Sequence, residues 1–119
     1  MVLVFSDGFS DNVFDSGMPH CIEEYLHQGM VTSLSKAADC LARKAYFLSK
    51  NPEYQSVWKK EYKYAADNNL ELPKGVPTNY TFIGGKQDDI TVTVAQVFKD
   101  RGADDRRRSL SARDTYFKN

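Results

Sequence analysis

The chain has 119 residues, which is enough for about one domain or part of one. Its 16 Lys and Arg residues balance 16 Asp and Glu residues, so the charge gives no indication of a nucleic-acid or anionic-membrane partner. No apolar run approaches the roughly 20 residues that a helix needs to span a bilayer. The hydrophobic content of 41% is that of an ordinary globular protein.

The first predicted element is a strand from Val2 to Phe5, because four consecutive apolar residues are typical of a strand buried on both faces. The strand ends at Ser6-Asp7-Gly8, where glycine allows a sharp turn. Asp7 is therefore expected at the tip of a rigid strand, which suits a metal-binding carboxylate, although most Asp-Gly pairs after strands are simple turns. Domains rarely begin with a strand buried on both faces, so we expect that this is not the natural start of the fold.

Both cysteines, Cys21 and Cys40, lie on segments predicted to be helical, and they do not form a metal-type pair. We expect them to be reduced thiols in the core of an intracellular protein. Met1 leads directly into the first strand without a signal-peptide pattern, so the expected location is the cytoplasm or the mitochondrion.

Three helices are predicted after the first strand. The first begins at Asp15 or Ser16 and ends near Gln28, where Gly29 stops it. The second begins near Thr32 or Ser33 and ends at Asn51-Pro52, because proline disfavours helical geometry in the residue before it. Apolar residues recur along it at three- and four-residue spacing, which predicts one buried stripe formed by Leu34, Ala38, Leu41, Ala45 and Leu48.

The third predicted helix runs from Tyr54 to Asn68. Its aromatic stripe is typical of core or interface packing and consists of Tyr54, Trp58 and Tyr62. Residues 70–83 contain Pro73, Gly75 and Pro77 and predict a loop. A second strand is predicted from Ile90 to Phe98, because this segment is rich in β-branched residues and partly alternating. From Lys99 onward seven basic and four acidic side chains predict a solvated tail.

The two predicted strands place their acidic residues together. If the strands pair antiparallel, the end of the first lies beside the start of the second, so Asp7 and Asp88 converge on one rim of the sheet, with Asp11 nearby. Crowded carboxylates resist ionisation unless a cation lies between them. An all-oxygen cluster suits magnesium or manganese, which activate water and bind phosphate oxygens. The alternative is that these acids only cap a helix and form a turn.

Two motifs resemble the metal-dependent serine/threonine phosphatases of type 2C. The carboxy-terminal half of that family has a strand ending in Ser-Asp-Gly, an apolar residue, then x-Asp, and it closes with a Gly- and acid-rich turn that leads into a strand. The motifs here read Phe5-Ser6-Asp7-Gly8-Phe9-Ser10-Asp11-Asn12 and Gly84-Gly85-Lys86-Gln87-Asp88-Asp89-Ile90-Thr91-Val92. The resemblance covers about Val2 to Phe98, and the Asn51-Pro52-x-Tyr54 element looks most like the organellar branch of the family.

The resemblance implies an α+β fold, namely the carboxy-terminal part of an α-β-β-α sandwich with antiparallel sheets flanked by helices. Residues 1–98 would be a portion of this domain and residues 99–119 a charged tail. Asp7 and Asp88 match carboxylates that bind the catalytic pair of Mg²⁺ or Mn²⁺, and Asp11 matches an acid at a weaker, additional metal position. Asp89 stands where many members have asparagine. In the family, a metal-bridging water attacks the phosphorus of phosphoserine or phosphothreonine, and no phosphoenzyme forms. For this chain the resemblance implies no catalytic residue beyond the metal ligands.

The chain departs from the family in one large respect. It has no counterpart of the amino-terminal Asp-Gly-His-Gly segment, of the further bridging Asp, or of the arginine that holds the phosphate. Two interpretations stay open. The chain is part of an active phosphatase that acts on phosphoproteins, or it is a truncated, catalytically dead relative with an interaction role. In both cases we expect the first strand to be covered by the missing half or by a partner protein.

Overall fold

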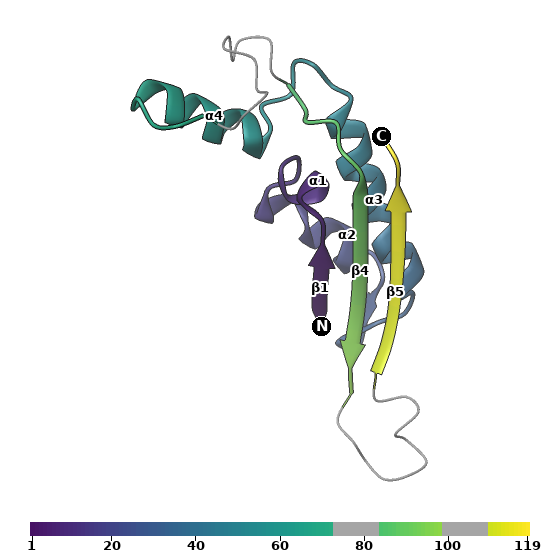
Figure 1. The fold of residues 1–119 in the computed structure, drawn as a ribbon. Helices are drawn as coiled ribbons and strands as arrows, with labels where there is room; N and C mark the ends of the chain where they lie inside the picture. Colours follow the sequence, from purple (N-terminus) through teal and green to yellow (C-terminus); the bar gives the residue numbers. More distant parts are fainter. Residues whose placement is uncertain (73–83, 99–109) are drawn as a thin grey trace.

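The computed structural model describes residues 1–72, 84–98 and 110–119. Its centre is a three-stranded antiparallel sheet of β1 (Val2–Phe5), β4 (Ile90–Val97) and β5 (Leu110–Phe117), with β4 in the middle. The long helix α3 (Leu34–Ser49) lies behind β4 and β5 (Figure 1). The described part of the chain is therefore α+β with antiparallel sheets and helices, as the sequence predicted.

The pairing of β1 with β4 is the relationship that positions the site. The two strands are antiparallel neighbours, as predicted, with Phe5 opposite Val92. Alternate side chains of β4 are fully buried, namely Ile90, Val92 and Val94. These β-branched side chains belong to the core that packs against α3. The sheet thus brings the end of β1 next to the start of β4.

Helix α3 forms the other layer of the core. It begins after Ser33, whose hydroxyl accepts a hydrogen bond from the N–H of Lys36. Its buried positions are Leu34, Ala37, Ala38, Leu41, Ala42, Ala45 and Ser49. Because four of these are alanine, the helix can approach the sheet closely. The predicted stripe is confirmed, except that Leu48 is only partly buried.

Helix α4 (Val57–Asp67) lies beyond the end of the sheet (Figure 1). It begins three residues later than predicted, because Ser56 forms its N-cap and accepts a hydrogen bond from the N–H of Lys59. Within the predicted aromatic stripe, Tyr62 is buried, and its ring lies 6.2 Å from that of Trp58. None of the helices in the described residues is long and apolar enough to cross a membrane.

The predicted helix from Asp15 to Gln28 is wrong as a single element. The structure has a short 3-10 helix, η1 (Asp15–Gly17), then α2 (Pro19–Glu23), and then a hairpin of β2 (Leu26–His27) and β3 (Met30–Val31). Between these strands, Gln28 and Gly29 have φ angles of 50° and 77°. Two-residue hairpin turns favour such positive φ values. Gly29 therefore belongs to a hairpin turn and does not end a helix.

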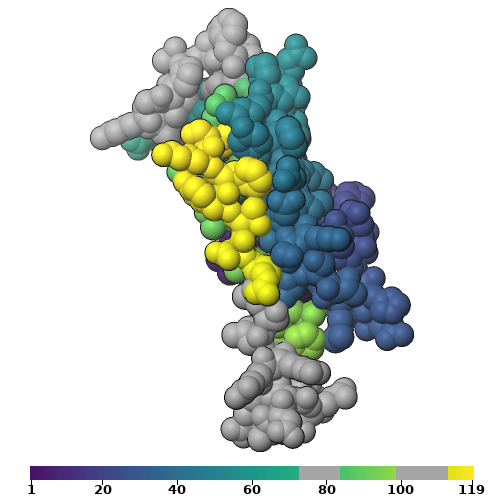
Figure 2. Space-filling view, turned by 90° about the vertical axis from the view of Figure 1, so that its right-hand side faces the viewer, coloured from purple at the N-terminus to yellow at the C-terminus, as the bar shows by residue number. Residues whose placement is uncertain are grey.

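Strand β5 corrects the prediction of a solvated tail. It pairs with β4 along the whole length of that strand, from Leu110 opposite Val97 to Phe117 opposite Ile90. Figure 2 shows β5 lying along α3, where the ring of Phe117 is 5.5 Å from that of Tyr46. Near the end of β5, exposed and half-buried side chains alternate, as is typical of a strand. The strand was not predicted because the segment is rich in charged residues. The rest of the predicted tail, residues 99–109, lies outside the described residues, as do residues 73–83 of the predicted loop.

The two cysteines are joined rather than reduced. Cys21 and Cys40 form a disulfide whose Cα atoms are 5.6 Å apart, and it connects α2 to α3. The prediction of free core thiols was therefore wrong, although Cys21 is buried as expected. Two cysteines 19 residues apart in the sequence come within bridging distance only once α2 has packed against α3.

Strand β1 is largely exposed, which differs from the predicted burial on both faces. It is an edge strand of the sheet, and the exposed fractions of Val2 and Val4 are 48% and 60%. Leu3 packs against the core, and the ring of Phe5 lies 4.9 Å from that of the buried Phe9. An apolar edge strand of this kind presents both side chains and unpaired backbone groups to solvent.

Candidate metal centre

Three predicted site residues surround one ammonium group. The Nζ atom of Lys86 lies 2.6 Å from Oδ2 of Asp11, 3.7 Å from Oδ2 of Asp88 and 3.9 Å from Oδ2 of Asp7. The structure therefore brings Asp7, Asp11 and Asp88 to one place, at the junction of β1 and β4. We call these four side chains the carboxylate cluster, with Lys86 at its centre.

Ser6 joins the two strands just before the cluster. Its backbone N–H donates to the carbonyl of Thr91, and its hydroxyl accepts from the N–H of Thr91 at 3.0 Å. The same hydroxyl donates to the carbonyl of Asp89 at 3.1 Å. These bonds fix the end of β1 against the start of β4. The serine of the Ser-Asp-Gly motif thus positions Asp7 and Asp88 relative to each other, a role that the motif alone does not indicate.

Gly8 is needed for a close approach of two backbone segments. It lies in the short helix α1 (Asp7–Ser10), and its φ is outside the left-handed region. A Cβ atom at this position would overlap the carbonyl oxygen of Asp89 and contact Cβ of Asp88 at 3.3 Å. The glycine therefore lets Asp7 and Asp88 come together, whereas the sequence suggested only a sharp turn.

Asn12 holds the main chain of Lys86. Its side chain is fully buried. The amide nitrogen donates to the carbonyl of Lys86 at 2.8 Å, and the amide oxygen accepts from the N–H of Lys86 at 2.8 Å. The same nitrogen donates to the carbonyl of Gly8 at 2.8 Å. Asn12 thus fixes the segment that carries both Lys86 and Asp88, and its place directly after Asp11 in the motif was the only signal in the sequence.

Gly84 and Gly85 pack closely against the backbone at the end of α3. A Cβ atom on Gly85 would overlap the carbonyl oxygen of Leu48, and one on Gly84 would overlap that of Pro52. The N–H of Gly85 donates to the carbonyl of Asn51 at 2.8 Å, and the hydroxyl of Ser56 donates to the carbonyl of Gly84 at 2.7 Å. The glycines thus let the second motif pack against the turn between α3 and α4.

Asp89 points away from the cluster, as the alternation of adjacent strand residues predicts. Its Oδ2 accepts a hydrogen bond from the hydroxyl of Tyr116 at 2.8 Å, and its Oδ1 accepts from the N–H of Asn119 at 3.2 Å. The bond to Asp89 is the main reason that the pKa of Tyr116 is raised above its ordinary value. Asp89 is therefore engaged by the end of the chain and is not available to the cluster.

The cluster is open to solvent on one side. The exposed fraction of the side chain rises from 18% for Asp11 and 27% for Lys86 to 40% for Asp88 and 72% for Asp7. Burial acts to lower the pKa of Lys86, but the hydrogen bond to Asp11 and the charges of the three carboxylates outweigh burial and raise that pKa above its ordinary value. Lys86 is therefore a cation at neutral pH.

The donor atoms fit a hard divalent ion, because all of them are carboxylate oxygens. Their arrangement around Lys86 is not that of a formed metal cage. Within residues 1–72, 84–98 and 110–119, no group of three or more His, Cys, Asp or Glu side chains is arranged to hold a metal ion. The chemistry of the cluster thus suits Mg²⁺ or Mn²⁺, while the ammonium of Lys86 occupies its centre.

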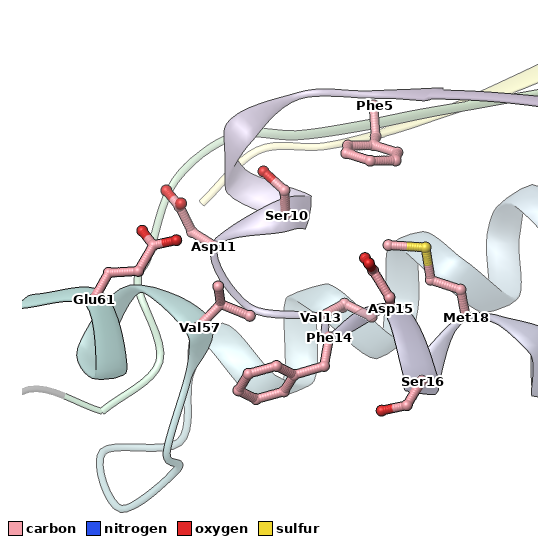
Figure 3. Close-up of a pocket in the computed structure, with 10 residues that line it drawn as sticks. All are labelled: Phe5, Ser10, Asp11, Val13, Phe14, Asp15, Ser16, Met18, Val57 and Glu61. Carbon is pink, nitrogen blue, oxygen red and sulfur yellow. The ribbon is translucent and has the colours of Figure 1, made fainter. Parts of the chain in front are cut away.

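A cavity of about 490 Å³ adjoins the cluster, since Asp11 forms part of its wall. Figure 3 shows Asp11 and Glu61 at one end of this cavity, with Phe5 and Phe14 on opposite sides of it. Asp15 also lines the cavity. A cavity lined by acidic and aromatic side chains therefore lies beside the carboxylate cluster.

One curated relative links this chain to a known class of protein. The chain is 35% identical over 98 residues to a protein of Oryza sativa subsp. japonica named "Probable protein phosphatase 2C 1". The match covers 82% of this chain and 27% of the rice protein, so the chain spans about a quarter of that relative's length. No family model and no solved structure matches the chain. The similarity supports a relationship to the phosphatase 2C family, in agreement with the two motifs.

Proposed function

We propose that this chain is the carboxy-terminal part of a phosphatase 2C-like domain of the organellar branch. In this proposal Asp7 and Asp88 bind the catalytic metal pair, and Asp11 contributes to a weaker, additional position. The observation that carries the proposal is the convergence of these carboxylates on one cation, from motifs that are more than 70 residues apart. The relationship to the rice phosphatase agrees with it.

The proposed ions are Mg²⁺ or Mn²⁺, which when bound would activate water and offset the charge of phosphate oxygens. The residues of this chain would hold and position them. Ser6 and Gly8 bring Asp7 to Asp88, and Asn12 fixes the backbone that carries Asp88. The site is prearranged by the sheet, which is what a catalytic centre needs.

The proposed substrate is a protein that carries phosphoserine or phosphothreonine. The cavity beside Asp11 leaves room for residues that flank the phosphorylated side chain. The exposed apolar edge of β1 supports a fold in which further strands or a partner protein cover it, as in the proposed sandwich. We propose the cytoplasm or the mitochondrion as its location.

A second candidate function is that of a catalytically dead, phosphatase-like interaction subunit. Lys86 favours it, because its ammonium already neutralises part of the carboxylate cluster. Because these 119 residues hold no counterpart of the Asp-Gly-His-Gly segment, we expect them alone, supplied with manganese, not to hydrolyse a phosphopeptide.

A chimera tests the proposed function. The matching segment of the rice relative is replaced by this chain, so that the rest of the rice protein supplies the other half of the site. Manganese-dependent hydrolysis of a phosphoserine peptide, present in the chimera and lost with Asp88→Asn, is the expected result. Asp39→Asn is the matched control, since Asp39 pairs with Arg43 on the exposed side of α3, outside both the cluster and the cavity. A folded but inactive chimera beside an active rice parent would favour the interaction subunit.

A further inference from the structure

Lys86 is the cationic member of the carboxylate cluster, and its position is built into the fold. Asn12 holds its N–H and its carbonyl at once, so the backbone cannot rotate to carry the side chain elsewhere. Three carboxylates from two separate segments lie within 4 Å of its Nζ atom. The pairing of β1 with β4 produces this geometry, because it brings the segment that carries Asp7 and Asp11 beside the segment that carries Lys86.

The ring of Trp58 is a second possible interaction partner for the ammonium of Lys86. Nζ of Lys86 lies 5.8 Å from the centre of this ring, which is within the range of a cation–π interaction. The main chain of Trp58 is fixed close by, because its backbone N–H donates to the carbonyl of Asp11 at 3.0 Å. The flexible four-carbon stem of lysine allows the ammonium to move between the carboxylates and the ring while the backbone stays in place.

We propose that Lys86 is a tethered competitor of the divalent metal. In the absence of metal it neutralises Asp7, Asp11 and Asp88 and holds the β1–β4 junction together. A divalent ion has to displace it from the carboxylates, so Lys86 weakens the affinity for metal and sets the metal concentration at which the site fills. This inference rests on the proposed function, because it takes the carboxylate cluster to be the metal site.

The energetic reason is charge repulsion at short range. A positive charge a few ångströms from an incoming cation repels that cation. At a partly exposed site, the repulsion energy corresponds to about a tenfold decrease in affinity for the cation. Replacing Lys86 by glutamine removes that charge and keeps most of the stem. The expected result is Mn²⁺ binding about tenfold tighter than in the unmodified chain.

The experiment is a calorimetric Mn²⁺ titration of the full chain, of Lys86→Gln and of Lys36→Gln. Lys36 is the matched control, because it carries the same charge in the first turn of α3, which is the end of that helix far from the cluster (Figure 1). Tighter binding only in Lys86→Gln supports the proposal. Equal affinity in all three proteins overturns the role of Lys86 and leaves the metal site intact, whereas no Mn²⁺ binding by any of them overturns both.

A second measurement needs no variant and therefore does not depend on the folding of Lys86→Gln. The unmodified chain is acetylated briefly with an amine-reactive ester, with and without Mn²⁺, and each lysine is quantified by mass spectrometry. Release of Lys86 from the carboxylates predicts a several-fold increase of its acetylation with Mn²⁺ and no change at Lys36. Acetylation of Lys86 that is unchanged or lowered by bound Mn²⁺ would overturn the proposal.

Discussion

The side-chain amide of Asn12 is joined to the peptide of Lys86 by a reciprocal pair of hydrogen bonds, each 2.8 Å long, between residues 74 positions apart. Because Asn12 is fully buried, its replacement by alanine leaves the Lys86 peptide and the Gly8 carbonyl without these partners. We expect Asn12→Ala to lower the free energy of unfolding by about 2–4 kcal/mol. Urea denaturation followed by circular dichroism measures this loss.

Asn68→Ala is the control for that substitution. The side chain of Asn68 makes one exposed hydrogen bond to the carbonyl of Tyr64, so its loss is expected to cost about 0.5 kcal/mol or less. Equal stabilities of Asn12→Ala and Asn68→Ala would show that the reciprocal pair does not hold the two motifs together.

Gly8→Ala should disturb the junction of β1 and β4. The added Cβ would overlap the carbonyl oxygen of Asp89, which is a backbone atom held by Ser6 and unable to move aside easily. We expect a loss of about 2 kcal/mol or more in the free energy of unfolding. Gly17→Ala is the control, because its Cβ would approach the end of the flexible Lys44 side chain at 3.1 Å and meet Val13 at an ordinary van der Waals distance of 3.6 Å. A Gly8→Ala protein as stable as Gly17→Ala would contradict the close approach.

The disulfide between Cys21 and Cys40 should contribute to stability. It closes a loop between residues 19 positions apart, and a bridge of that span stabilises a protein by about 3 kcal/mol in the chain-entropy description. A reducing agent should therefore lower the free energy of unfolding of the unmodified chain by that amount. The double variant Cys21→Ser/Cys40→Ser should be insensitive to the reductant. Two free thiols in the purified, non-reduced protein would count against the pairing.

The exposed edge of β1 should cause self-association of the isolated chain. Val2 and Val4 are apolar and half or more exposed on an edge strand, which invites pairing with another chain. Sedimentation velocity at rising concentration should show oligomers, and Val4→Lys should shift the chain toward monomer. Tyr64→Lys, at a similarly exposed position on α4, should leave the association unchanged. A monomeric unmodified chain at every concentration would contradict this expectation.

The elements that sequence predicted well are those whose signal is local. The apolar stripe of α3 and the β-branched alternation of β4 follow from the burial of one face, so both are visible in a short window of residues. Once antiparallel pairing of β1 with β4 was assumed, the prediction that Asp7 lies near Asp88 needed no other assumption, and the structure has this pairing. The alternation of adjacent side chains along an extended segment accounts for Asp89, which points away from the cluster and accepts a hydrogen bond from Tyr116.

The features that sequence did not predict depend on contacts between distant segments. Lys86 and Asn12 were visible in the motifs, but their roles follow only from bonds that cross 74 or more residues. The charged composition of β5 concealed a strand, because only its pairing with β4 shows which side chains face the core. The disulfide likewise depends on how α2 packs on α3. The turn at Gln28-Gly29 was missed because glycine also commonly ends helices.

The most direct test of the metal centre is Mn²⁺ binding by the full chain and by Asp7→Asn, Asp88→Asn and Asp15→Asn, measured by calorimetry. Each of the first two substitutions removes one carboxylate charge from the cluster and keeps the shape of the side chain, so binding should weaken about tenfold or more. Asp15→Asn removes the same charge from the wall of the neighbouring cavity and should bind Mn²⁺ like the unmodified chain. Affinities that are unchanged by Asp7→Asn and Asp88→Asn would contradict a metal centre at the junction of β1 and β4.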